Sequence, residues 1–460
     1  MPSFRCPNTK VSISMESNMT LVSDNLLYDT PVRAPQFPAA YPQFDDFVFW
    51  NPNSWTKGPP HKLFDRMRSQ APVMWTDAGK KLAGFWSITG YDDIKTVELN
   101  SDVYSSERGS INLAMPRERP KKYQRLANAA VNSLINLDAP RHMHFRIQMK
   151  DFFIPQYVNE IADRVSARVD QLLDDAERAG PVVDFVKIFS EKLPLFTLCE
   201  MLGIDEEDRP KIIRWMHFLE LAQQFVSSPA RTFLAEPSFP FQFDRNVQEM
   251  FEYGKRILED RRRNPRHDLL SAIAAAELDG TPLSQEWLDG SWLLIIFAGN
   301  DTSRNSISGT LRLLTEFPDQ RQLILDDPSL VPSAVQESLR MISPVMNMRR
   351  TALADSELNG QRIAKDEKLV LWYGAANRDP RIFKDPHRMD ITRENVTKHL
   401  AFGHGPHKCL GSRIAQMQLQ ISLSKILERF PNITWTGKQK ISPNNLVHAI
   451  SSLEVNLNGR

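Results

Sequence analysis

The sequence is poor in cysteine, in net charge and in long apolar segments. Its three cysteines are too few and too scattered for a disulfide framework, which favours a reducing, cytoplasmic environment: Cys6, Cys199 and Cys409. The 57 basic and 56 acidic side chains leave a net charge of +1, which argues against nucleic acid as a partner. No apolar run reaches the roughly 18 residues that a membrane-spanning helix needs, so no transmembrane anchor is expected.

The chain also lacks low-complexity linkers and internal repeats that would divide it into domains. Its start is polar and has no apolar signal core. Residues 1–44 are therefore predicted to be a partly disordered lead-in, and residues 45–460 a single domain. A composition of 41% hydrophobic and 25% charged residues is typical of a globular protein with a large core. We expect a monomer.

Hydrophobic periodicity predicts a mainly α fold with a minor β part. Predicted helices cover 61–70, 91–99, most of 141–263, 285–316 and 332–343; predicted strands cover 73–76, 85–88, 350–353 and 368–373. The first two strands flank a turn and should form a hairpin. Ser284 can cap the long helix that ends before Pro318.

Two segments lack such a pattern. Residues 105–134 are expected to be an irregular, solvated loop with a run of basic side chains: Arg117, Arg119, Lys121, Lys122 and Arg125. Residues 228–243 combine prolines with phenylalanines, which is atypical of a helix or a polar loop. An apolar lid, a patch that touches a membrane surface and plain packing against the protein body all remain open for this segment.

One loop concentrates features of a metal-binding thiolate. Gly403, Gly405 and Gly411 surround Cys409 and permit tight turns, and an amphipathic run from Ser412 to Phe430 follows directly. The backbone N–H groups at the start of a helix favour a thiolate over a thiol. A small buried cysteine before a helix is the alternative interpretation of this residue alone.

The segment from Ala401 to Gly411 resembles the Phe-Gly-x-Gly-x-His-x-Cys-x-Gly signature of the cytochrome P450 superfamily at every fixed position. This resemblance implies a triangular-prism fold in which the minor β part is largely antiparallel and a long central helix lies over a haem b. It also implies that the haem iron is bound by the Cys409 thiolate. It also places Phe402, Gly411 and Ala298 against the cofactor.

The middle of the long predicted helix is interrupted by residues that disfavour helix. Gly299, Asp301 and Thr302 predict a local opening, where a freed carbonyl and the Thr302 hydroxyl can hold water. The segment is similar to the acid–alcohol pair of the family. By that resemblance Thr302 hydrogen-bonds dioxygen and Asp301 relays protons. Without the resemblance, a hydroxyl bonded back to a helix carbonyl would explain Thr302.

Further charged and histidine residues resemble family elements that hold the haem or stabilise its loop. Glu337 and Arg340 share a helix face at i, i+3 and resemble a Glu-x-x-Arg element, for which Arg388 is the candidate third member. These three residues are predicted to be structural. Four residues match the positions that bind the haem propionates: His142, Arg146, Arg350 and His407.

Apolar residues near these motifs are predicted to contact the substrate, which implies that the substrate is apolar. They are Ile295, Ala298, Val345, Met346, Asn347, Val447, Ala449 and Ile450.

The implied function is monooxygenation, in which one atom of O2 enters a C–H bond of a lipophilic alkyl, terpenoid or sterol side chain. Electrons are expected from a separate ferredoxin and its reductase. Such a donor is acidic, and it could dock on a basic face of this protein around the thiolate, formed by Arg141, Lys150, Lys408 and Arg413. A peroxide-driven haem-thiolate peroxygenase and a non-catalytic haem-thiolate sensor are the alternatives. The pair Asp301 and Thr302 disfavours both.

Overall fold

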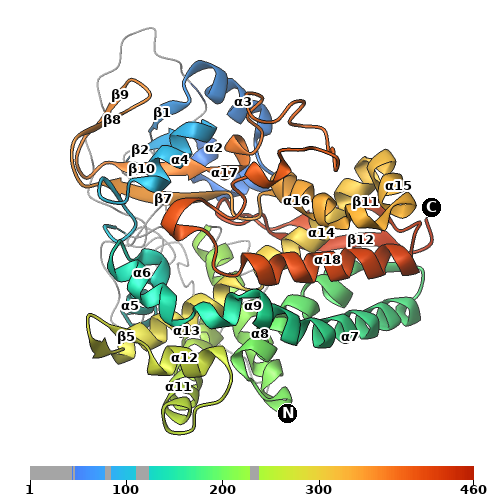
Figure 1. Cartoon of the computed structure of the whole chain (residues 1–460), viewed down its shortest axis with the longest axis horizontal. Coiled ribbons are helices and arrows are strands. Elements are labelled where there is room, and N and C mark those ends of the chain that lie inside the picture. Colours follow the sequence, from blue (N-terminus) through green and yellow to red (C-terminus); the bar gives the residue numbers. More distant parts are fainter. Residues whose placement is uncertain (1–43, 45–46, 78–83, 110–123, 228–237, 460) are drawn as a thin grey trace, which may run out of the picture.

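A computed structural model describes residues 44, 47–77, 84–109, 124–227 and 238–459. The chain forms a mainly helical protein with small sheets, which confirms the predicted fold class (Figure 1). The β-rich part lies at the top of this view, and helices fill the middle and the bottom. Among the described residues, no helix combines the length and the apolar character that crossing a bilayer requires.

The β-rich part is a five-stranded sheet in the order β1-β2-β10-β7-β3. Its strands are β1 (Val73–Thr76), β2 (Phe85–Ile88), β10 (Lys368–Trp372), β7 (Asn347–Ala352) and β3 (Tyr104–Ser105). The predicted β1–β2 hairpin is confirmed, and only the β2–β10 pair is parallel. Near this sheet lie α2 (Phe47–Trp50), η1 (Pro52–Trp55), α3 (His61–Gln70), α4 (Tyr91–Leu99) and α17 (Tyr373–Ala376).

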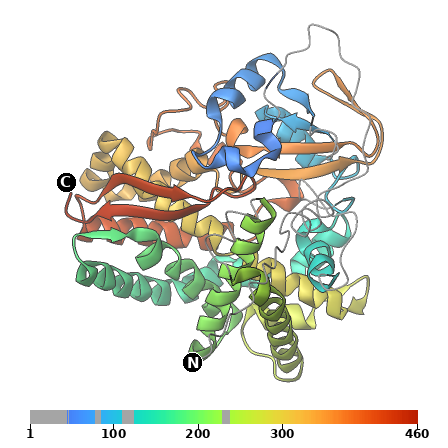
Figure 2. The ribbon, with the colours of Figure 1, turned by 180° about the vertical axis from the view of Figure 1, so that it is seen from behind.

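A second sheet pairs β11 (Thr434–Ile441), β12 (Ile450–Asn456) and β4 (Val182–Asp184) in antiparallel fashion. Seen from behind, its two long red strands lie between the β-rich part and α7 (Figure 2). Two short hairpins are β5 (Glu277–Leu278) with β6 (Thr281–Pro282) and β8 (Ser356–Leu358) with β9 (Gln361–Ile363).

Long helices form the core beside this sheet. In α7 (Pro155–Ala179), apolar residues recur every three or four positions, so one face is buried: Ile161, Val165, Val169, Leu172 and Ala176. From Val165 to Ala176 this face packs in one cluster with α14 (Asp301–Glu316), α16 (Val331–Ile342) and α18 (Ser412–Arg429). The ion pairs Lys425–Asp170, at 2.7 Å, and Arg429–Asp174, at 2.5 Å, also join α18 to α7.

The remaining helices are α5 (Gln124–Val131), α6 (Arg141–Gln148), α8 (Lys192–Leu202), α9 (Arg209–Ser227), α11 (Phe239–Arg263), α12 (Leu269–Ala275), α13 (Gln285–Ala298) and α15 (Pro318–Asp326). Short 3-10 or π turns are η3 (Leu134–Asn136), η4 (Lys150–Phe153), η5 (Val186–Ser190), η6 (Glu206–Asp208), η7 (Pro328–Leu330), η8 (Val396–Lys398) and η9 (Gly405–His407).

The long helix predicted over 285–316 is two helices. Helix α13 ends at Ala298 and α14 begins at Asp301, and Gly299 and Asn300 form a turn between them. Asn300 stays in the right-handed region but deviates from ideal helix geometry, at φ −102° and ψ −60°. The predicted opening is thus present. Ser284 does precede α13, but its side chain makes no capping hydrogen bond, so the capping prediction is wrong.

Two loop predictions also need correction. Helix α5 lies inside the segment predicted to be irregular, and the half-exposed Arg125 side chain pairs with Asp289 and Glu252, both at 2.6 Å. The other four basic residues of that run lie outside the described residues. Residues 228–237 also lie outside the described residues. At the described end of that segment, Phe239 begins α11 and is buried against Phe218 and Leu221, which agrees with plain packing against the protein body.

Candidate functional site

The loop before α18 holds Cys409 in a tightly turned backbone. Gly403 and Gly405 have φ of +68° and +63°, a region that favours glycine. A Cβ atom at Gly405 would also lie 2.7 Å from the carbonyl oxygen of Glu98. Gly411 has φ −79° and no protein atom within 4 Å of a Cβ position, so the protein alone does not require glycine there.

The Cys409 thiol lies deep among protein atoms and yet has accessible surface. Its backbone N–H donates to the Phe402 carbonyl at 2.8 Å, which fixes the loop. Burial raises the pKa of the thiol, whereas the Gly411 N–H and the charges of Arg146 and Lys408 lower it. The thiol is therefore both reachable and surrounded by groups that stabilise the thiolate.

Basic groups from α6, from β7 and from the loop itself gather around Cys409. The rings of His142, on α6, and His407 lie 4.1 Å apart, and the Arg146 guanidinium donates to the Lys408 carbonyl at 2.6 Å. Burial and nearby arginines lower the pKa of His142 to about 4. Burial, Arg350 and the other basic groups lower that of His407 to about 2.

The same cluster is short of negative charge. The Nδ1 atom of His142 is buried without a hydrogen-bond partner among the described residues. Glu98 is the carboxylate that faces Arg350, at 3.8 Å. An anionic group would relieve this crowding of cations, so the residues present fit the propionates of a haem held by Cys409.

Glu98 itself is a residue that the sequence analysis missed. It is buried on α4, and its Oε1 atom accepts a hydrogen bond from the Tyr373 hydroxyl at 2.6 Å. Burial raises its pKa to about 7, although Arg350 and Tyr373 oppose the shift. Tyr91, Ile94 and Glu98 recur at i, i+3 and i+7, so helical periodicity could have placed this carboxylate on the buried face.

Asp301 and Thr302 begin α14 directly after the break. The Thr302 hydroxyl donates to the Ala298 carbonyl at 3.1 Å, so the back-bonded conformation that was the alternative interpretation is present at the predicted opening. The Asp301 carboxylate lies 3.4 Å from the Arg304 guanidinium. One turn later, Asn305 donates to the Asp301 carbonyl at 2.7 Å and accepts from the Ile450 N–H at 2.6 Å, which ties the opening to β12.

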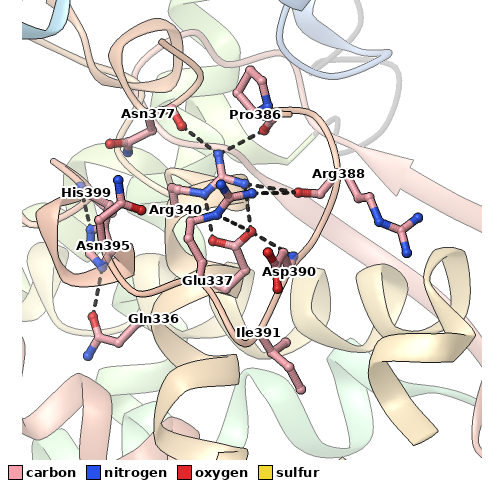
Figure 3. Close-up of polar contacts among 12 residues, drawn as sticks. Gln336, Glu337, Arg340, Asn377, Pro386, Arg388, Asp390, Ile391, Asn395 and His399 are labelled. Atoms are coloured by element: carbon pink, nitrogen blue, oxygen red, sulfur yellow. Dashed lines mark hydrogen bonds and ion pairs between the residues drawn. The ribbon is translucent and has the colours of Figure 1, made fainter. Parts of the chain in front are cut away.

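Glu337 and Arg340 form the predicted pair, fully buried, at 2.7 Å (Figure 3). The prediction of Arg388 as third member is wrong. Its guanidinium points away to Asp319 at 2.6 Å, and only its carbonyl accepts from Arg340. Arg393 supplies the third cation instead, because its Nε atom lies 3.5 Å from Glu337 Oε1 and its side chain is buried.

Most predicted substrate contacts are packed inside the protein. Ile450 is 0% exposed in the core beside α7, and Met346 is 3% exposed in the cluster around Trp372, so the prediction is wrong for both. The buried Asn347 amide donates to the Asn445 carbonyl at 2.6 Å. Val447 and Ala449 are buried as well. Ile295, Ala298 and Val345 retain accessible surface and stay candidates.

Comparison with known proteins accounts for this arrangement. The cytochrome P450 family model matches residues 42–456. The chain is 33% identical to linalool 8-monooxygenase of Pseudomonas putida, over 88% of this chain and 97% of that protein. It is 30% identical to a methyl-branched lipid omega-hydroxylase of Mycobacterium bovis, over 92% and 96%.

A solved structure of a Mycobacterium marinum cytochrome P450 in complex with pseudoionone superposes with a TM-score of 0.79 at 31% identity, covering 91% of this chain and 100% of that one. The match in fold, together with the cysteine loop and its basic neighbours, extends over nearly the whole chain. The chain therefore belongs to the cytochrome P450 family of haem-thiolate monooxygenases.

Proposed function

We propose that this monooxygenase hydroxylates a C–H bond of an alkyl chain, a terpenoid or a sterol side chain. The observation that carries the proposal is the similarity to relatives that act on linalool and on methyl-branched lipids and to a structure that holds pseudoionone. Three of the predicted contact residues keep accessible surface, and all three are apolar, as such substrates require: Ile295, Ala298 and Val345.

Haem bound through Cys409 supplies the iron chemistry that activates dioxygen. In this proposal His142, Arg146, Arg350 and His407 hold the two propionates through charge-assisted hydrogen bonds. Phe402, Ala298 and Gly411 would contact the macrocycle. Support comes from the approach of the four basic groups to one another and from their shortage of carboxylate partners.

Asp301 and Thr302 are proposed to deliver protons at the helix break. Because the Thr302 hydroxyl donates its own proton to the Ala298 carbonyl, its oxygen is left as an acceptor for the next proton donor. Asp301, the residue before Thr302, can carry the proton to that oxygen once its carboxylate leaves Arg304.

The electron donor is proposed to be an external ferredoxin with its reductase, docking on the face around Lys408. Lys150, Lys408 and Arg413 are exposed there, and so are the apolar Met143 and Ile147 of α6. Arg141 contributes less to a basic face than expected, because it pairs with Glu107 at 2.8 Å and Asp279 at 3.0 Å. We further propose a monomeric, cytoplasmic protein with one domain over 45–460.

The proposal is tested on purified haem-loaded protein. Reduction under carbon monoxide should give a strongly red-shifted Soret band that Cys409→Ala abolishes. Linalool, alkanes and sterols are then screened for spin-state shifts, and NADH-driven product formation is measured with a surrogate ferredoxin and reductase. A histidine-type spectrum would contradict the thiolate assignment, and an absence of product from every lipophilic class would contradict the substrate assignment.

Two variants separate the residue roles. Asp301→Asn should lower turnover by about 10²-fold with the Soret spectrum unchanged, since general acid–base groups contribute on the order of 10²–10⁴. Turnover with peroxide alone would favour a peroxygenase. Lys408→Glu should slow reduction by the ferredoxin at low salt, and unchanged reduction kinetics would count against the docking face.

A further inference from the structure

A second group of basic side chains lies apart from the cysteine loop, behind the strap that joins β11 to β12. Arg378 follows α17, His448 belongs to the strap, His61 begins α3, and Arg312 lies on α14. These four residues come from distant parts of the sequence. Backbone hydrogen bonds join the segments of His448 and Arg378, because the Met346 N–H donates to the Leu446 carbonyl at 2.8 Å and the Met346 carbonyl accepts from the Tyr373 N–H at 3.0 Å. Arg378 and Arg312 both lower the pKa of His61 and of His448, and Arg312 also lowers that of Arg378.

Each of the four carries a buried nitrogen without a hydrogen-bond partner among the described residues. These atoms are His61 Nδ1, Arg378 Nε and Nη1, the ring nitrogens of His448, of which one faces the Ile342 carbonyl, and Arg312 Nε, which has only a long ion pair with Glu316 at 3.5 Å. Arg378 and His448 are only 6% and 3% exposed. Buried polar atoms nearly always have partners, so such a concentration in one place indicates a ligand.

The group also carries uncompensated positive charge. Burial lowers the pKa of Arg378 to about 9, so its guanidinium is still a cation at neutral pH. Burial, with Arg312 and Arg378, lowers the pKa of His448 to about 3, against a small opposing effect of the Ile342 carbonyl, so this imidazole is neutral. His61 is neutral for the same reason, since burial lowers its pKa well below 6.5.

The carboxylates that face Arg378 are committed to other cations. Asp65 binds Arg68 at 2.5 Å and His387 at 2.9 Å. Glu337 is the buried partner of Arg340. Arg312 has a long ion pair with Glu316, at 3.5 Å. Within the described part of the chain, the Arg378 guanidinium has no carboxylate in contact.

We propose that Arg378, His448, His61 and Arg312 form an internal binding site for a small monovalent inorganic anion, with chloride as the probe. The guanidinium supplies charge and two N–H donors. The neutral imidazoles of His61 and His448 carry one N–H each, and the His448 ring shares its N–H between the anion and the Ile342 carbonyl that faces it. A water molecule would satisfy the donors but not the charge of a desolvated guanidinium. The burial of Arg378 and His448 selects a small anion over an organic one.

The site has a structural consequence for the proposed substrate pocket. His448 lies between Val447, which pairs with Val345 in a β-bridge, and Ala449. Its backbone N–H donates to the Pro344 carbonyl at 2.9 Å. An anion bound to His448 and Arg378 would therefore hold the strap against the turn that follows α16.

The test uses haem-loaded protein freed of halide. Crystals soaked in sodium bromide should give an anomalous peak within hydrogen-bond distance of Arg378 and His448. In solution, the thermal midpoint should rise with chloride or bromide and saturate, whereas sodium sulfate at equal ionic strength should give a smaller, non-saturating change. Arg378→Gln should remove both the peak and the saturating response.

Arg362→Gln is the matched control. Arg362 is an exposed arginine paired with Asp355 at 2.7 Å on the β8–β9 hairpin, so this variant should keep the peak and the response. If Arg378→Gln does not fold, the bromide map and the halide titration of the unaltered protein still decide. Absence of the peak at Arg378, or equal responses to halide and sulfate, would overturn the proposal in favour of ordered water.

Discussion

The polar groups around Glu337 and those around Cys409 are both buried and rich in cations, but they differ in how completely they are paired. Arg340 donates to both oxygens of Glu337 and to the carbonyls of Asn377 and Pro386 (Figure 3). Glu337 also accepts from the Asp390 N–H and from Arg393. Its network is saturated by the protein itself.

The groups around Cys409 are not saturated in this way. Within the described residues, Glu98 is the acid that opposes Arg350, and the Nδ1 atom of His142 is without a partner. The comparison teaches that a buried polar cluster with complete pairing stabilises the fold. A buried cluster of cations with too few carboxylates instead binds a ligand. The environment of Arg378 belongs to the second class by the same criterion.

Glu337→Gln is the strongest test of the first half of this comparison. The change leaves the buried Arg340 and Arg393 without their carboxylate, so we expect the free energy of unfolding to fall by about 3–5 kcal/mol. Urea unfolding followed by circular dichroism measures it. Asp355→Asn, which breaks an exposed pair with Arg362, is the control and should leave the urea midpoint nearly unchanged, because water screens an exposed pair. Equal losses in the two variants would contradict the distinction.

Glu98→Gln tests the second half through pH. The folded pKa of Glu98 is raised from 4.5 to about 7, so between these values the folded state holds a proton that the unfolded state has released. Stability from this group is complete below about pH 4.5, decreases as the pH rises and is lost above about pH 7. Haem propionates near Arg350 would shift the pKa further in the same direction.

As the pH rises from 5 to 8, the free energy of unfolding of Glu98→Gln should therefore increase relative to that of the unaltered protein by about 2–3 kcal/mol. This follows from the rule of about 1.4 kcal/mol per pKa unit. Urea unfolding of both haem-loaded proteins at the two pH values measures the difference. Glutamine retains the acceptor for the Tyr373 hydroxyl, so loss of that bond does not complicate the result. A pH-independent difference would mean that Glu98 is ionised throughout.

The sequence was sufficient for features carried by contiguous residues. The Cys409 loop, the helix break after Ala298 and the Glu337–Arg340 pair each lie within a few positions, so local pattern and resemblance located them. Element type was also predictable where periodicity is strong, as in the β1–β2 hairpin.

Features that depend on side-chain direction or tertiary packing were not predictable. Met346 and Ile450 are as apolar as pocket residues, and only packing shows that they belong to the core. Arg388 and Arg393 lie in one irregular segment, where no periodicity tells which guanidinium turns inward. The unpaired atoms of Arg378 and His448 likewise appear only when four distant segments come together.

Arg388→Ala is expected to have the smallest effect and separates the two arginines. The Arg388–Asp319 pair has side chains that are 58% and 50% exposed, and such pairs contribute about 0–1 kcal/mol. The Arg388 carbonyl still accepts from Arg340 in the variant, because the substitution leaves the backbone intact. Arg393→Ala is the matched comparison, and it should lower the urea midpoint clearly more because it removes a buried cation from Glu337. If Arg388→Ala were the more destabilising of the two, the guanidinium of Arg388 would turn toward Glu337 in solution, and the original assignment from the sequence would be restored.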